Sequence, residues 1–196
     1  MKPIYLGLTG YRRSGKSTLA ELLQDNHGYV RVHPADGMKA ALFTYLTRAG
    51  IPEGEAYQML YGMLKDKEHP MLPAPPRVLM EALGEAMGKA YPACAWTLGM
   101  ELMRPALQGV QRIVVESVVY EEPALRALGG LIVKIHRPTS GNQGLPTDLA
   151  VDAIDPDVQV FNDGSLADLR EEAARLHEWA SSPRAGEQLE LFDQPA

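Results

Sequence analysis

The stretch Gly10-Tyr-Arg-Arg-Ser-Gly-Lys-Ser17 decides the fold of this chain. It matches the pattern G-x-x-x-x-G-K-[ST] in full, and it lies between the apolar run Ile4–Thr9 and a helical pattern at 18–24. A strand before such a loop and a helix after it are the context in which the loop binds phosphate. A chance glycine-rich turn is the alternative, and this context argues against it. The sequence therefore predicts a nucleoside-triphosphate site.

The residue types of this loop suit triphosphate chemistry. Gly10 and Gly15 allow the backbone to wrap a phosphate so that successive N–H groups point at it. The positive end of the following helix adds to this field. Lys16 is expected to reach the β- and γ-phosphates, and the Ser17 hydroxyl to bind Mg²⁺. The residues expected to hold ATP are Gly10, Arg12, Arg13, Ser14, Gly15, Lys16, Ser17 and Thr18.

The composition limits the class of protein. The chain has 196 residues, 45% of them hydrophobic and 22% charged, which suits one well-buried soluble domain. A net charge of −6 argues against direct, broad binding of nucleic acid. A single cysteine allows no internal disulfide, and no run approaches the ~20 apolar residues that span a bilayer. We therefore expect a cytoplasmic protein with no membrane partner.

Apolar runs alternate with helical patterns along the chain. Strands are expected at 4–9, 29–33, 111–116, 131–135 and 158–161, and helices at 16–27, 36–49, 53–64, from 77, at 95–109, 121–128 and 166–179. This alternation predicts an α/β fold with a mostly parallel sheet of about five strands flanked by helices. Residues 137–157 are rich in Pro, Thr, Ser, Gly, Asn and Asp, so we expect a lid-like loop there.

Several charged residues are expected near the carboxyl ends of the strands, where ligands of such sheets bind. Asp36 and Lys39 lie one helical turn apart after the second strand, and the alternative for them is a solvated ion pair. Arg77 opens a helix after a proline-rich connector, and Arg137 begins the lid-like loop. Their guanidinium groups could bind phosphate.

Glu116 ends an apolar strand, which is the arrangement of an acid that holds Mg²⁺ directly or through water. Ser17 and Glu116 are therefore the expected metal ligands. The chemistry implied is in-line transfer of a γ-phosphoryl group, with Lys16, Mg²⁺ and arginines neutralising the developing charge. A phosphate acceptor would need no strong general base.

Further stretches follow in a fixed order over nearly all of residues 1–178. They are Ala35-Asp36-x-Met38-Lys39, Asp66-Lys67-Glu68, Pro76-Arg77-x-Leu-Met, Leu83-Gly84, Trp96, 112–116, His136-Arg137-Pro138 and Phe161-Asn162-Asp-Gly-Ser165-Leu. This collinear set resembles the deoxynucleoside monophosphate kinases of bacteriophages, which belong to the P-loop nucleotide kinases. The resemblance implies a P-loop kinase fold and transfer from ATP, with Mg²⁺, to a (deoxy)nucleoside monophosphate.

The residues and the resemblance together give a domain organisation and a set of site residues. A kinase domain is expected at 1–180, with monophosphate-binding helices at about 36–108 and the lid-like loop at about 137–157. The expected catalytic residues are Lys16, Arg137 and Asp36. The residues expected to contact the acceptor are Asp36, Lys39, Lys67, Arg77 and Glu81.

The chain departs from the family at several positions. Glu81, Glu85 and Lys89 stand where the family has Gln, Thr and Arg. The segment Glu116-Ser117-Val118-Val119 lacks an arginine that the family has next to its acid. Either Glu116 or Ser117 could take the place of that acid.

The last part of the chain, 181–196, is expected to be a flexible tail. Its segment Gln188-Leu-Glu-Leu-Phe192 resembles the short peptide by which bacterial replication proteins dock on the sliding clamp. Gln188, Leu189, Leu191 and Phe192 would make the contacts. The alternative is that these apolar side chains fold back on the domain or stabilise a homodimer.

Three functions remain open at this stage. The first is a nucleoside monophosphate kinase, acting in the cytoplasm, or in the host cytoplasm if a phage encodes the chain. The second is a P-loop kinase of another small molecule, such as dephospho-coenzyme A. The third is a non-catalytic P-loop protein that docks on the replication clamp.

Overall fold

The structure is a computed structural model, and it describes residues 3–90, 109–142, 144 and 146–182 of the chain. Two compact units divide the chain: unit 1 comprises Met1–Pro34 and Leu102–Ala196, and unit 2 comprises Ala35–Glu101. The tail motif at 188–192, Trp96 and nearly all of the helix expected at 95–109 lie outside the described residues.

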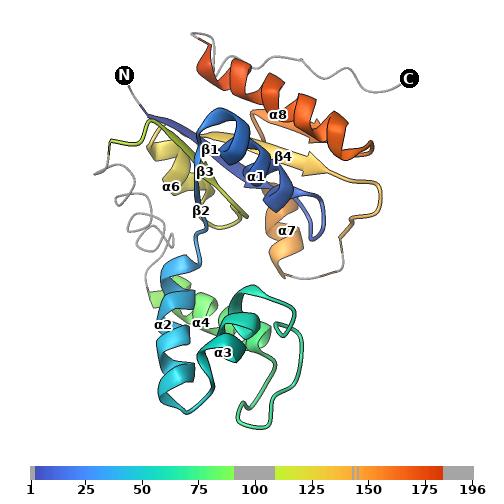
Figure 1. The fold of residues 1–196 in the computed structure, drawn as a ribbon. Helices are drawn as coiled ribbons and strands as arrows, with labels where there is room; N and C mark the ends of the chain where they lie inside the picture. The colour runs from blue at the N-terminus through green and yellow to red at the C-terminus, as the bar shows by residue number, and fades with distance from the viewer. Residues whose placement is uncertain (1–2, 91–108, 143, 145, 183–196) are drawn as a thin grey trace. The chain divides into compact units, whose positions relative to one another are not determined.

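Unit 1 is built on a five-stranded sheet in the order β2-β3-β1-β4-β5 (Figure 1). The strands are β1 (Ile4–Thr9), β2 (Val30–Val32), β3 (Arg112–Val115), β4 (Leu131–His136) and β5 (Val158–Phe161). Every neighbouring pair is parallel. The predicted α/β fold with a parallel sheet of about five strands is thereby confirmed.

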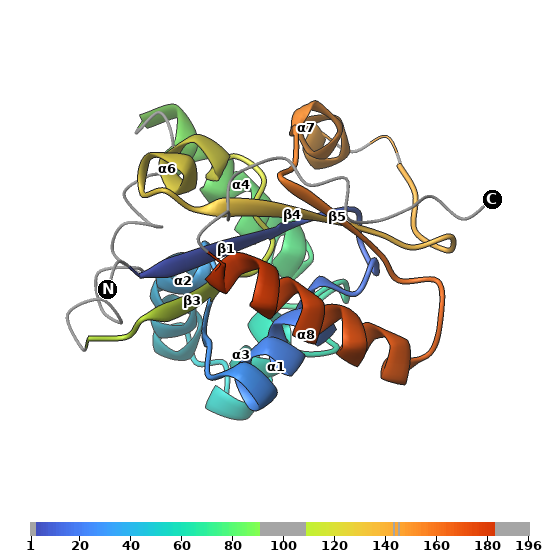
Figure 2. The same ribbon diagram turned by 90° about the horizontal axis from the view of Figure 1, so that it is seen from above.

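Helices cover both faces of this sheet. On one face, α1 (Lys16–His27) packs against α8 (Leu166–Ser181). Figure 2 shows α6 (Glu122–Ala127) and α7 (Pro146–Ala153) on the opposite face. Lys134 of β4 donates a hydrogen bond from Nζ to the carbonyl oxygen of Val151 in α7 at 3.0 Å. This bond ties α7 to the sheet.

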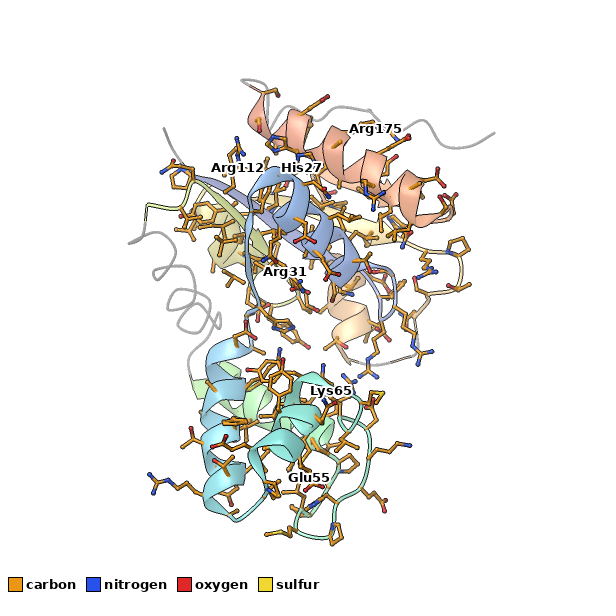
Figure 3. The ribbon with its side chains drawn as sticks, in the orientation of Figure 1. His27, Arg31, Glu55, Lys65, Arg112 and Arg175 are labelled. Atoms are coloured by element: carbon orange, nitrogen blue, oxygen red, sulfur yellow. The ribbon has the colours of Figure 1, made fainter. Side chains whose placement is uncertain are left out.

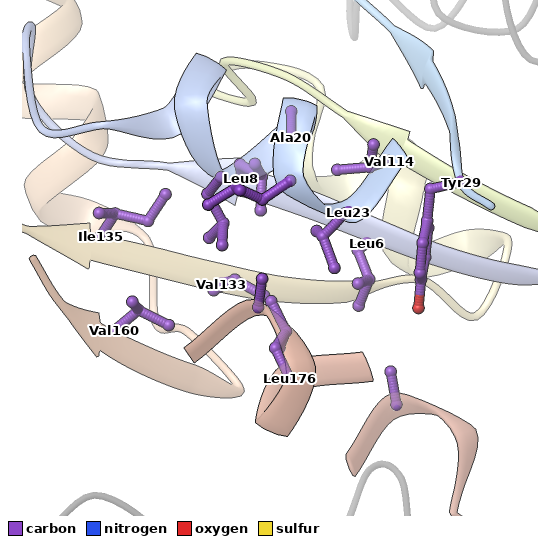
Figure 4. Close-up of a cluster of buried hydrophobic side chains, with 14 of the residues drawn as sticks. Leu6, Leu8, Ala20, Leu23, Tyr29, Val114, Val133, Ile135, Val160 and Leu176 are labelled. Carbon is purple, nitrogen blue, oxygen red and sulfur yellow. The ribbon is translucent and has the colours of Figure 1, made fainter. Parts of the chain in front are cut away.

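The main hydrophobic core lies between the sheet and the α1–α8 layer (Figure 4). Its fully buried side chains include Leu6, Leu8, Leu19, Leu23, Val133 and Leu176. Successive residues of a strand point to opposite faces, and here both faces are covered. Therefore β1 must be apolar almost throughout, which is the pattern that predicted it.

Two predicted helix boundaries are confirmed by their capping groups. Gly28 ends α1 at φ 68°, the left-handed conformation that glycine adopts readily, and its N–H bonds to the carbonyl of Gln24. Ser165 begins α8 in a capping box with Asp168: the Ser165 side chain accepts from the Asp168 N–H, and the Asp168 carboxylate accepts from the Ser165 N–H.

The prediction that residues 137–157 form only a loop is wrong. Helix α7 occupies Pro146–Ala153 within that range. Its eight residues are fewer than the window of about 11–18 residues in which helical periodicity can be recognised, so the sequence pattern gives no helical signal there. Contacts with the rest of unit 1 stabilise the helix, and the hydrogen bond from Lys134 to Val151 is one of them. Several other elements are shorter than expected, and the largest differences are that β2 covers only Val30–Val32 and that α3 ends at Tyr61.

Unit 2 is a small helical body. Its helices are α2 (Asp36–Arg48), α3 (Glu53–Tyr61) and α4 (Pro76–Ala90), and an irregular connector joins the last two. Its own core includes Met38, Leu46, Met59, Leu60 and Met80. Within the described ranges of both units, no helix has the length and hydrophobicity that crossing a bilayer requires.

Candidate functional site

The loop between β1 and α1 has a conformation that only glycine allows at two positions. Gly10 lies at φ 139°, and a Cβ there would come 2.5 Å from the carbonyl oxygen of Ile135. Gly15 lies at φ 106°, and a Cβ there would come 2.3 Å from Nδ2 of Asn162. Asn162 Nδ2 donates to the Ser14 carbonyl at 2.8 Å. Both predicted glycines therefore have a steric reason as well as a conformational one.

The other loop residues differ in exposure. Arg12, Arg13 and Ser17 are exposed at the surface, where they can meet a ligand. Ser14 is fully buried, and its hydroxyl has no hydrogen-bond partner among the described residues. Because a buried hydroxyl without a partner is costly, this atom is available to a ligand group that enters the loop.

Lys16 closes the loop on itself. Its Nζ donates to the carbonyl oxygens of Gly10 at 2.8 Å and Tyr11 at 2.7 Å. Burial lowers the pKa of Lys16 to about 8, while the negative charge of Glu116 acts in the opposite direction. Lys16 is therefore mostly charged at neutral pH, and its ammonium group is held by two carbonyl oxygens that phosphate oxygens could replace.

The predicted metal acid, Glu116, follows β3 directly and is 7% exposed. It is paired with Arg31 of β2, whose Nε and Nη2 donate to Oε1 at 2.9 and 2.7 Å. Figure 3 labels Arg31 on this strand. The alternative residue, Ser117, lies in the left-handed region at φ 61°. Glu116 is the better candidate because it is the carboxylate.

The chemistry of the donors fits Mg²⁺. Within the described ranges no three His, Cys, Asp or Glu side chains gather as a metal cage. Mg²⁺ does not need one, since it usually keeps several waters and binds one or two carboxylates together with substrate phosphates. A serine hydroxyl at position 17 and one carboxylate at position 116 match that requirement. Both belong to unit 1.

A pocket of about 240 Å³ opens beside the loop. Its lining residues are Tyr11, His136, Arg137, Pro138, Ser140, Phe161 and Asp163. The His136 ring stacks on the Phe161 ring, with centroids 5.1 Å apart and an interplanar angle of 19°. Burial lowers the pKa of His136, which keeps it neutral. The pocket thus presents a flat apolar wall and the guanidinium of Arg137.

Helix α7 is linked to the phosphate loop. The Tyr11 hydroxyl donates to Asp152 Oδ1, and Asn142 Nδ2 donates to Asp152 Oδ2 at 2.9 Å. Asp148 of α7 is only 4% exposed, and its charge raises the pKa of Lys16. Asp148 and Asp152 are not among the site residues predicted from the sequence, because the composition of residues 137–157 predicts a loop there. The run of four aspartates at 148, 152, 155 and 157 was the available signal.

The predicted acceptor residues belong to unit 2. Lys39 Nζ lies 3.3 Å from Asp36 Oδ1 and 5.0 Å from the centre of the Tyr61 ring. Lys39 is largely buried, whereas the Asp36 side chain is 35% exposed, so the pair is only partly open to solvent. Its role as a binding site stays a prediction.

Arg77 is also paired within unit 2. Its Nη2 donates to Asp66 Oδ2 at 3.0 Å, its Nε also bonds to Asp66, and its backbone N–H donates to the Lys65 carbonyl. Lys67 and Glu81 are exposed. The predicted tail contacts Gln188, Leu189, Leu191 and Phe192 lie outside the described residues.

Comparisons with known proteins concern the fold. A scan against protein-family models finds no match, and a search of the curated proteins finds none. The crystal structure of TT1252 from Thermus thermophilus is 20% identical, over 91% of this chain and 98% of its own, with a TM-score of 0.50. A dephospho-CoA kinase from Campylobacter jejuni is 17% identical, over 90% of this chain and 96% of its own, with a TM-score of 0.48. At such identities the first likeness shows the fold alone.

Proposed function

We propose that this protein is a kinase that transfers the γ-phosphoryl group of Mg-ATP to a nucleoside monophosphate. One observation carries the proposal. The phosphate loop and the 240 Å³ pocket share Tyr11, whose backbone carbonyl accepts a hydrogen bond from Lys16 while the residue also lines the pocket. A ligand with a chain of phosphates at one end and a flat ring at the other fits such a continuous site.

The donor half of the reaction follows from unit 1. The triphosphate would take up the N–H groups of the loop, and the Lys16 ammonium would leave the Gly10 and Tyr11 carbonyls for phosphate oxygens. The adenine ring would lie against the stacked His136 and Phe161 rings. Mg²⁺ would be held by Ser17 and, directly or through water, by Glu116, and when bound it neutralises the charge that develops on the transferred group.

The acceptor half is argued from unit 2. Asp36, Lys39 and the Tyr61 ring place a negative charge, a positive charge and an aromatic face next to one another. Lys39 Nζ is 3.3 Å from Asp36 Oδ1 and 5.0 Å from the centre of the Tyr61 ring. Arg77 offers a guanidinium whose present partner, Asp66, is itself well exposed. These groups suit a ligand that carries both a phosphate and a base. The oxyanion of a phosphate is nucleophilic at neutral pH, so no general base is required.

Purified protein incubated with Mg-ATP and a panel of acceptors tests this function. The panel contains the ribo- and deoxyribonucleoside monophosphates, with dephospho-coenzyme A as the alternative acceptor. We expect at least one monophosphate to raise ADP release well above the ATPase background. Phosphorylation of dephospho-coenzyme A alone would move the proposal to that acceptor. If no compound raises ADP release, the kinase proposal fails and the non-catalytic reading remains.

We further propose that the tail docks on a bacterial sliding clamp. The support is the sequence Gln188-Leu-Glu-Leu-Phe192, which offers an amide and apolar anchors on a polar tether. We expect the full chain to bind the clamp of its host in a pull-down, and Phe192→Ala to lose most of that binding. Equal binding of the clamp by Phe192→Ala and by the unaltered protein would remove the proposal. It would also be removed if Phe192→Ala only dissociated a homodimer and did not change binding of the clamp.

A further inference from the structure

The carboxylate of Glu116 is held by a residue from a neighbouring strand. Arg31 lies on the edge strand β2, and in the parallel register its Cα pairs with that of Val114 in β3. The backbone N–H of Glu116 donates to the Val32 carbonyl at 2.8 Å. Backbone and side chain of Glu116 are therefore both fixed to β2, 85 residues earlier in the chain.

The hydrogen bonds from Arg31 are unevenly shared between the two carboxylate oxygens. Nε and Nη2 both donate to Oε1, at 2.9 and 2.7 Å. No hydrogen bond to Oε2 from the described part of the chain is found. Two donors from one planar guanidinium converge on Oε1 and hold the position of that oxygen, and the rigid fork of arginine supplies both from one side chain. Oε2 remains free to accept from water.

The position of this pair ties it to the phosphate loop. β3 pairs with β1, and the backbone N–H of Val118 donates to the Leu8 carbonyl at 2.8 Å, so the segment after β3 runs beside the residues that enter the loop.

A purely structural role explains this arrangement less well. The backbone ladder already joins β2 to β3 through three register pairs. The Arg31 side chain is 31% exposed and that of Glu116 is 10% exposed. An ion pair that is partly open to solvent adds little to stability, on the order of 1 kcal/mol or less. The fixed position of one carboxylate oxygen is better explained if the Glu116 carboxylate has a functional role that requires this position.

We propose that Arg31 is a positioning residue for the metal, which fixes Glu116 through Oε1 so that Oε2 is oriented toward metal-bound water at the phosphate loop. This inference rests on the Mg-ATP site of the proposed function, but not on the acceptor. Groups that orient a metal ligand typically contribute 10- to 100-fold to metal affinity or activity. Arg31 would do so from a strand that carries none of the loop residues.

The test measures binding, so that it does not depend on phosphoryl transfer. ATP affinity is measured by titration calorimetry in excess EDTA and in excess Mg²⁺, and the ratio of the two affinities gives the contribution of the metal. We expect Arg31→Gln to leave the affinity in EDTA near that of the unaltered protein and to reduce the Mg²⁺ contribution about 10-fold or more. Arg31→Lys should recover only part of it, because it lacks the planar pair of donors.

Two matched variants separate positioning from folding. Arg112→Gln removes another arginine of the same sheet, one that donates to the His27 carbonyl, and it should leave the Mg²⁺ contribution unchanged. Glu116→Gln should lose as much as Arg31→Gln, and the double variant should lose no more than either single one.

Three outcomes would overturn the inference. In the first, the contribution of Mg²⁺ to ATP affinity is unchanged in Arg31→Gln. In the second, that contribution increases in Arg31→Gln, which would mean that Arg31 competes with the metal for Glu116. In the third, the losses of the two single variants add up in the double variant. The inference would also be overturned if the ATP affinity of the unaltered protein were the same with and without Mg²⁺. Failure of every acceptor in the kinase assay would leave these binding results standing, so the two failures are distinguishable.

Discussion

Lys16→Met is expected to abolish phosphoryl transfer and at the same time to stabilise the nucleotide-free protein. Transfer should fall by about 100-fold or more, because the ammonium group is the cation that neutralises the charge on the phosphates. The stabilisation follows from the pKa of Lys16, which burial lowers from 10.5 to about 8. The folded protein therefore holds a charged group in an environment that disfavours its charge.

The size of the stabilisation can be bounded. A shift of this size corresponds to at most about 3 kcal/mol at neutral pH. The substitution also removes the hydrogen bonds from Nζ to the carbonyls of Gly10 and Tyr11, and each is worth about 1 kcal/mol. We expect a net gain of about 1 kcal/mol, which for a chain of this length raises Tm by roughly 2–4 °C. Denaturant and thermal unfolding measure it.

The pH dependence supplies the control. Because the folded pKa of Lys16 lies below the unfolded value, the unfolded state binds more protons between pH 8 and 10.5. The unaltered protein should therefore gain stability relative to Lys16→Met as pH rises through that range, and the advantage of the variant should disappear. A variant that is less stable at pH 7 than the unaltered protein, or whose difference is independent of pH, would contradict the electrostatic reason.

Gly10→Ala is expected to cost about 3 kcal/mol or more of unfolding free energy and to remove ATP binding. The backbone at this position has φ 139°, and the new Cβ would lie 2.5 Å from the Ile135 carbonyl oxygen. That oxygen belongs to the backbone of β4, so it cannot move aside as a flexible side chain would. The loop must shift, and its N–H groups then no longer converge on a phosphate.

Gly109→Ala is the matched control, because Gly109 also has a positive φ, 73°, but apart from its chain neighbours no atom of the described residues lies within 4 Å of the new Cβ. It should cost only the conformational strain of about 1 kcal/mol and leave ATP binding intact. Urea unfolding and ATP titration compare the two variants. Equal costs for Gly10→Ala and Gly109→Ala would show that the close approach to β4 is not what requires glycine.

The sequence predicted the parts of the fold whose signal is local. The motif Gly10–Ser17, the continuous apolar run of β1 and the start of α8 at Leu166 each depend on a few neighbouring residues, and each has the expected structure. Helix α7 was not predicted because its stabilising contacts come from Lys134 and Tyr11, which lie outside the helix and, for Tyr11, far away in the chain. An eight-residue helix has little propensity to form without such contacts.

The site was predictable only where spacing along one element decides it. Asp36 and Lys39 are one helical turn apart and lie on the same face of α2, as the spacing predicts, with 3.3 Å between Lys39 Nζ and Asp36 Oδ1. The burial of Lys39 and its approach to Tyr61 depend on how α2 and α3 pack. The Arg31–Glu116 pair depends on the strand order, which places β2 beside β3. No local pattern in the sequence contains that order.

We propose that Lys16 and its loop serve transfer of phosphate to a nucleoside monophosphate. The most direct measurement follows Mg-ATP and each acceptor by phosphorus NMR, with Lys16→Met as the paired control. We predict the resonances of ADP and of a nucleoside diphosphate to grow together, in equal amounts, with the unaltered protein and not with the variant. Growth of inorganic phosphate in place of the diphosphate, or equal product with both proteins, would contradict the account.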